Sequence, residues 1–226
     1  MRPGAARVLA CPKCGRWLRC QALDLTRRLG TTVWSDLRVE DGFWQTPSRL
    51  AACPHCAIVL CKETAEYIGV LPSSAEELSC SSPHSAGWRR LFAWRDTNDL
   101  IEQFRSAPPV APLTAEAVEL ALAGSSERDE VELRLQLWRL HNDVRRNTGN
   151  GHAVPDAYRG NVLRLLTLIR PVDEYHCLLA AELHRQLGHF HAAMAQLSYI
   201  RESFGREKAA MLEWVIENNS DLHIYH

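Results

Sequence analysis

Hydrophobic and polar positions follow two different periods, and the change from one period to the other divides the chain. The first sixty residues alternate short apolar and aromatic runs with turn signals, as in RWLRCQALD, TTVWSDLRVEDGFW and AIVLC. This pattern predicts three or four short β-strands. Beyond Pro112 the apolar residues recur at helical spacing. The sequence therefore predicts an α+β protein with a β-rich N-terminal part and an all-α C-terminal part.

The C-terminal part carries helix start and stop signals that predict antiparallel helical hairpins. Thr114 is a suitable N-cap for the first helix, and Pro171 and Gly188 end two later ones. The segment DEVELRLQLWRLHNDVRRN places one apolar stripe along a long helix, formed by Val131, Leu135, Trp138 and Val144. Turns of two to five residues between such helices are typical of a helical stack.

The middle of the chain has weaker signals. From Glu63 to about Pro112 it is rich in Ser, Pro and Gly, and DTNDLIEQFRS predicts one short helix there. We expect a β-rich domain over residues 1–62, a connector with a short helix over 63–112 and a helical domain over 113–226.

Composition and charge narrow the class of protein. The chain of 226 residues is 46% hydrophobic and 23% charged, which is ordinary for a globular protein and excludes disorder throughout. Residues 1–62 carry a net charge of +6 and the remainder −7, so the first part is suited to phosphates or an acidic protein surface. We expect no membrane span and no signal peptide, and therefore a cytoplasmic protein, in which clustered cysteines indicate metal ligands.

Two copies of one cysteine turn give the strongest chemical signal. Cys11-Pro-Lys-Cys14-Gly and Cys53-Pro-His-Cys56-Ala each place two thiols on a tight turn. Four thiolates surround one Zn²⁺ tetrahedrally and leave no open position, so we expect a structural zinc ion and no zinc catalysis. The alternative, a redox-active CxxC, would need a single motif beside a βαβ pattern.

A second zinc ion is an additional hypothesis. Its four ligands would be Cys20, Cys61, Cys80 and His84. Alternatively, Cys20 and Cys61 are small buried hydrophobic residues within strands.

Two groups of residues are candidates for ligand binding. The first part of the chain is basic and aromatic and could bind a nucleic acid. Its candidate residues for stacking on bases are Trp17, Trp34 and Trp44, and those for neutralising phosphates are Arg16 and Arg19. In the helical part, a polar cluster is formed by His141, Asn142, Asp143 and Arg146. Its simplest interpretation is capping of a helix C-terminus; the alternatives are a binding feature, or an enzyme site around His141, Asp143 and His152.

Five stretches carry a resemblance to a known group of proteins: CPKCG, CPHC, the WSD of Trp34–Asp36, LWRLHNDVRR and AELHRQLGHFHAA. In these the chain resembles uncharacterised bacterial proteins that join an N-terminal zinc ribbon to a C-terminal tetratricopeptide-like helical domain. The resemblance implies a ribbon followed by a tetratricopeptide-like stack of helical hairpins, with Ala181 and Ala193 at a close helix approach. It implies no particular reaction, and a plain helical bundle remains an alternative.

These observations favour a non-enzymatic adaptor whose zinc ribbon and helical stack bind protein partners. The alternative is a nucleic-acid-binding protein that uses the basic, Trp-rich ribbon.

Overall fold

The computed structural model describes residues 5–21, 31–41, 44–45, 48–71, 99–148, 156–201 and 203–225. Within these ranges the fold is mixed α+β, which confirms the predicted class. The chain forms two compact units. The cysteine unit contains Met1–Arg27 and Pro47–Leu113, and the helical unit contains Arg28–Thr46 and Thr114–His226.

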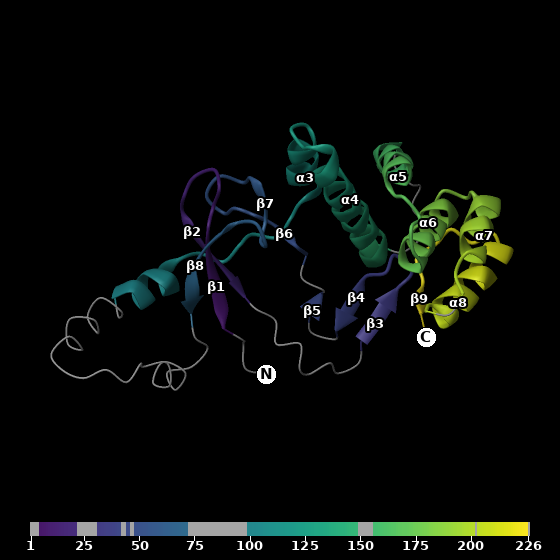
Figure 1. Cartoon of the computed structure of the whole chain (residues 1–226), viewed down its shortest axis with the longest axis horizontal. Coiled ribbons are helices and arrows are strands. Elements are labelled where there is room, and N and C mark those ends of the chain that lie inside the picture. Colours follow the sequence, from purple (N-terminus) through teal and green to yellow (C-terminus); the bar gives the residue numbers. More distant parts are fainter. Residues whose placement is uncertain are drawn as a thin grey trace. The chain divides into compact units, whose positions relative to one another are not determined.

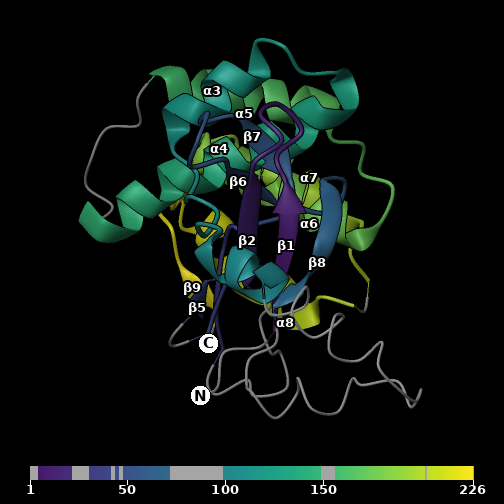
Figure 2. The same ribbon diagram turned by 90° about the vertical axis from the view of Figure 1, so that its left-hand side faces the viewer.

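The cysteine unit is built from short antiparallel strands. Its three-stranded sheet has the order β2-β1-β8, with the central strand β1 paired on both sides (Figure 2). A separate two-stranded hairpin joins β6 and β7. The strands are β1 (Ala6–Ala10), β2 (Trp17–Gln21), β6 (Leu50–Ala52), β7 (Val59–Cys61) and β8 (Glu66–Leu71).

Part of the predicted connector belongs to this unit. Residues 99–106 are helical, which confirms the short helix, and the Phe104 side chain is buried. Its ring lies edge-on to Trp17, with 5.6 Å between centroids, and so close to Gly69 that a Cβ there would lie 2.7 Å from it. Glycine is therefore required in β8 where the aromatic ring crosses the strand.

The segment after this helix joins the strands themselves. The Arg19 N–H donates to the Pro108 carbonyl at 2.8 Å, and the Val110 N–H donates to the Arg19 carbonyl at 2.9 Å. Ala52 and Ala111 exchange two backbone hydrogen bonds of 3.1 and 2.9 Å in an antiparallel bridge. The predicted connector is thus in part a structural element of the cysteine unit.

The helical unit contains a series of helices in which each packs against the next (Figure 1). They are α3 (Ala115–Leu122), α4 (Glu127–Thr148), α5 (Asp156–Leu168), α6 (Glu174–Gln186), α7 (Phe190–Ser198) and α8 (Gly205–Ile216). Thr114 is the predicted N-cap of α3, and its hydroxyl accepts from the Ala117 N–H at 3.2 Å. Ala181 and Ala193 are fully buried in one core cluster between α6 and α7. Helical hairpins are present, and tetratricopeptide-like stacking remains a prediction.

A small sheet also belongs to the helical unit. It has the order β5-β4-β3-β9, and β9 contributes the last described residues of the chain. Its strands are β3 (Thr31–Trp34), β4 (Val39–Asp41), β5 (Trp44–Gln45) and β9 (Ile224–Tyr225). Because Val33 and Trp34 pair with Tyr225 and Ile224, this sheet joins residues about 190 positions apart in the sequence.

The observed division differs from the predicted boundary at residue 62. Residues 28–46 lie in the helical unit, although their alternating pattern resembles that of the ribbon strands around them. An alternating pattern identifies a half-buried strand but does not identify the core against which the strand packs. Here Val33 packs against the apolar core of the helical unit, and the turn that follows contacts polar groups on α4 and α6. A strand pattern does not reveal either set of partners.

One predicted side-chain position on α4 is wrong. Val144 is 59% exposed, whereas Trp138, Asn142 and Arg145 lie buried on one face. These three residues follow the helical spacing of three to four residues. The buried stripe of α4 is therefore apolar in its first half and polar in its second half.

Candidate functional site

The two cysteine turns have the same backbone conformation. In each, the residue after the second cysteine has a positive φ, 69° at Gly15 and 57° at Ala57. Its N–H donates to the carbonyl of the first cysteine at 2.9 Å, both at Cys11 and at Cys53. The two turns are therefore equivalent halves of one site, as their repeated sequence indicated.

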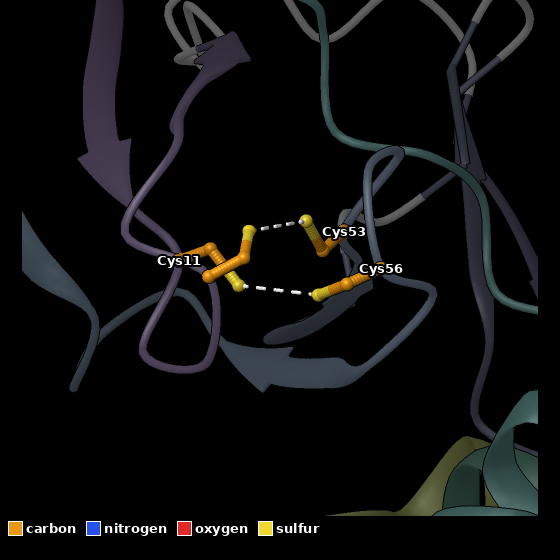
Figure 3. A group of neighbouring side chains, drawn as sticks. Cys11, Cys53 and Cys56 are labelled. Atoms are coloured by element: carbon orange, nitrogen blue, oxygen red, sulfur yellow. Dashed lines mark hydrogen bonds between the residues drawn. The ribbon is translucent and has the colours of Figure 1, made fainter.

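The four cysteine sulfurs converge at one point. Cys11 Sγ lies 3.6 Å from Cys56 Sγ, and Cys14 Sγ lies 3.8 Å from Cys53 Sγ, so each contact joins the two turns (Figure 3). All four sulfurs lie within 4.8 Å of one another. A tetrahedron with zinc–sulfur bonds of about 2.3 Å has edges of about 3.8 Å. The observed separations therefore match the ligand shell of one Zn²⁺ ion.

Backbone groups and burial act on the thiols in opposite directions. Burial opposes ionisation of Cys11, but the N–H groups of Cys14 and Lys13, together with neighbouring cysteine side chains, lower the pKa of this thiol to about 7. Burial raises the pKa of Cys53 to about 12, although N–H groups of its own turn oppose the rise. The interaction between the Cys11 and Cys53 side chains lowers the pKa of Cys11 and raises that of Cys53. A thiol beside a thiolate thus favours ionisation of one cysteine of the pair and opposes ionisation of the other.

The cysteine site also forms much of the local core. Cys11 and Cys53 are buried together with Leu18 and Leu60, and Val110 packs against them. The tips of the turns point outward, because Lys13, Cys14 and His55 are exposed. The arrangement suits an ion that holds a small core together, and the four sulfur ligands leave it no open coordination position.

The hypothesis of a second zinc site has less support than the four-cysteine site. Among the described residues, the only cluster of three or more metal-ligating side chains is the four-cysteine one, and it includes neither Cys20 nor Cys61. Both of these are partly buried residues of strands β2 and β7. Cys80 and His84 lie outside the described residues.

The residues predicted to contact nucleic acid are divided between the two units. Trp17 packs on Phe104 in the cysteine unit, while Trp34 and β5, which contains Trp44, belong to the helical unit. Arg19 donates from Nε to the Ala107 carbonyl at 2.6 Å. Arg16 is exposed and lies 3.3 Å from His55 Nδ1, measured from Nη1.

The predicted polar cluster of α4 lies against the turn Trp34–Arg38, which we call the docking turn. Asp36 is fully buried there, where it accepts from Asn142 Nδ2 at 3.0 Å and pairs with Arg146. Asp143 pairs with both Arg38 and Arg146. The Arg146 guanidinium also lies 4.9 Å from the centroid of the Trp34 ring. Asn142, Asp143 and Arg146 therefore hold the docking turn on the helix.

A second buried ion pair contacts the same turn. Glu182 and Arg185 on α6 are fully buried and paired, with Nε–Oε2 and Nη2–Oε1 distances of 2.8 Å. Ser35 donates to Glu182 Oε1 at 2.7 Å, and its N–H donates to the His223 carbonyl at 2.8 Å. The docking turn thus joins α4, α6 and the C-terminal segment.

Sequence reasoning did not select Ser35, Glu182 or Arg185 as site residues. The available signals were the charged pair at i,i+3 inside the apolar run AAELHRQL and the WSD motif.

The structure describes two residues of the predicted enzyme group, His141 and Asp143, and each lies against other partners. His141 lies beside Tyr158, with 5.7 Å between ring centroids, and burial lowers the pKa of this histidine. Asp143 instead pairs with two arginines. The structure shows no hydrogen bond between His141 and Asp143, both of which it describes. His152 lies outside the described residues.

Comparisons with protein-family models, curated proteins and solved structures found no match to this chain.

Replacing Ala57 by Gly should stabilise the cysteine unit. Ala57 has a φ of 57°, which costs an L-residue about 1–2 kcal/mol. After the entropy that glycine adds to the unfolded chain, we expect a gain of about 0.5–1 kcal/mol in zinc-loaded protein, measured by urea unfolding. The matched change is Gly15→Ala, where a Cβ meets nothing within 4 Å, and it should destabilise the unit by a similar amount. Equal stability of Ala57→Gly and wild type would contradict the predicted backbone strain at Ala57.

Replacing Asp36 by Ala should strongly destabilise the helical unit. The change leaves the buried Arg146 without one of its two carboxylates, so we expect a loss of about 3–5 kcal/mol in the free energy of unfolding. The control is Glu63→Gln, whose pair with Arg49 is more than half exposed. That change should cost less than about 1 kcal/mol. A similar cost for both substitutions in urea unfolding would show that the Asp36 contact is not the stronger one.

Proposed function

We propose that the protein is a non-enzymatic adaptor that binds one structural zinc ion through Cys11, Cys14, Cys53 and Cys56. The observation that carries the proposal is the convergence of four sulfurs at tetrahedral separations. Thiolate sulfur is a preferred zinc ligand, and a ligand set of four thiolates is typical of structural sites. The bound ion supplies folding energy to a unit whose core is small.

An adaptor role is supported by the exposed surface of the helical unit. A shallow groove of about 570 Å³ lies along α7 and α8, lined in part by Phe190, Met194, Val215 and Ile216. Ile216 is 68% exposed and Met194 is 43% exposed. Large apolar side chains at a groove between helices are typical of surfaces that bind a protein segment. The buried charges of Arg146 on α4 and of Glu182 on α6, in contrast, are occupied by the docking turn.

Nucleic-acid binding has less support than protein binding. Its favourable observation is the exposure of Lys13 and Arg16 at the first cysteine turn. However, Trp17 has an aromatic partner and Trp34 has a cationic one, so neither ring is a free stacking platform.

Among the described residues, none of the helices combines the length and the apolar character that a membrane crossing requires.

The zinc proposal predicts the metal content of the purified protein. We expect one zinc ion per chain by elemental analysis, and less than a tenth of that in Cys11→Ser. Near-UV circular dichroism should show loss of the Trp17 environment in the variant because zinc binding contributes folding energy. The matched control is Cys20→Ser, which removes a cysteine outside the cluster and should keep the zinc. Wild-type protein without zinc, or equal zinc in both variants, would refute the site.

The adaptor proposal predicts that a partner binds through the groove. Proximity labelling in the native host should recover a protein with the wild type and lose it with Met194→Glu and Ile216→Glu, because each places a charge at the apolar groove. The matched control is Leu120→Glu on α3, which is 77% exposed and does not line the groove. Identical sets of labelled proteins for all variants would contradict this assignment.

A further inference from the structure

The path of the chain links the cysteine site to the docking turn. The 38 residues between Cys14 and Cys53 include Arg28–Thr46, which belong to the helical unit. The chain therefore leaves the cysteine unit after the first cysteine pair and returns before the second. Cysteines that bind one ion thus lie on both sides of the docking turn in the sequence.

The docking turn is also separated from the helices by a long stretch of chain. Between Thr46 and Thr114 lie the 67 residues Pro47–Leu113 of the cysteine unit. Every contact of Asp36 or Ser35 with α4 and α6 closes this loop. The entropic cost of closing a flexible loop grows as about (3/2)RT ln n with the number of residues n.

The folded cysteine unit shortens this loop. Ala52 and Ala111 exchange two backbone hydrogen bonds in an antiparallel bridge, close to the points where the chain enters and leaves the unit. Across this bridge the path from Thr46 to Thr114 falls from 67 residues to about ten. When the flanking segment β3–β5 and the helices are each treated as already ordered, the loop-closure relation makes docking of the turn about 20-fold more favourable.

The bridge rests directly on the cysteine site. Ala52 is the last residue of β6 and precedes Cys53, and both are buried. Val110, beside Ala111, packs against the core cluster that contains Cys11 and Cys53. An ion that holds the four sulfurs together therefore also holds the two chain segments that form the bridge.

We propose that zinc binding at the four cysteines strengthens docking of the Trp34–Arg38 turn in the helical unit about 20-fold. The metal state of one unit thereby controls the order of a buried element in the other, through chain connectivity. This inference rests on the proposed zinc site.

Hydrogen exchange on the full chain tests the proposal. The reporters are the N–H groups of Trp34, Ser35 and Leu37, which donate to the carbonyls of Arg38, His223 and Trp34. We expect chelation of zinc to lower their protection about 20-fold, while amides of Phe190–Ser198 in α7 change less than twofold. Zinc content is measured on the same samples. Protein that never contains zinc refutes the proposed site and the inference together, whereas zinc-binding protein with unchanged turn protection refutes the inference alone.

A second variant tests the bridge without altering a metal ligand. Ala111→Pro removes the N–H that donates to the Ala52 carbonyl, and Ala111→Ser is the matched control that keeps it. We expect protection of the docking turn to fall about 20-fold in Ala111→Pro and to stay at the wild-type value in Ala111→Ser. Equal turn protection in the two variants, whatever their zinc content, overturns the proposal.

Discussion

The buried carboxylate of Asp36 is the contact on which the arrangement of the helical unit depends. A charge that is removed from water requires a partner of opposite sign, and Arg146 and Asn142 supply the ionic and hydrogen-bonding partners. These partners occupy the second half of the buried stripe of α4, where the docking turn covers Asn142 and Arg146 and the C-terminal segment pairs with Arg145. Ser35 makes the corresponding contact with the Glu182–Arg185 pair on α6. Two helices and the C-terminal strand therefore share one element from the N-terminal part of the chain.

This requirement also explains the unusual spacing of the cysteines. The chain must reach α4 and α6 between the two cysteine pairs, which separates Cys14 from Cys53 by 38 residues. The cysteine unit that remains has short strands, and among its described residues a core cluster surrounds Cys11 and Cys53. Metal ligation is a natural source of additional stability for a unit built from such short strands. Its last segment, 107–111, completes the unit by hydrogen bonding to β2 and β6.

The polar residues of α4 and α6 that lie against the docking turn have structural partners, and this affects how function is inferred. Asp143 and Arg146 are the kind of residues that suggest a catalytic or binding site in a sequence, yet both are paired within the unit. The surface of α7 and α8 has the opposite character, with exposed Met194 and Ile216 beside a groove. The proposed adaptor role follows from this contrast between occupied charges and exposed apolar side chains.

The sequence alone determined the features that depend on local chemistry. The CPxC repeats identified all four converging cysteines, because a tight turn with two thiols is a local structure. Thr114 and Gly188 marked helix ends, since capping and a positive φ are properties of single positions. Tertiary structure alone decided the core in which each strand lies. Residues 31–41 have the pattern of a ribbon strand pair, but their polar turn is buried by charges that lie more than 100 residues later in the chain. A periodic pattern shows which side of an element is buried. A contact between complementary charges on distant segments, in contrast, forms only once the chain has folded.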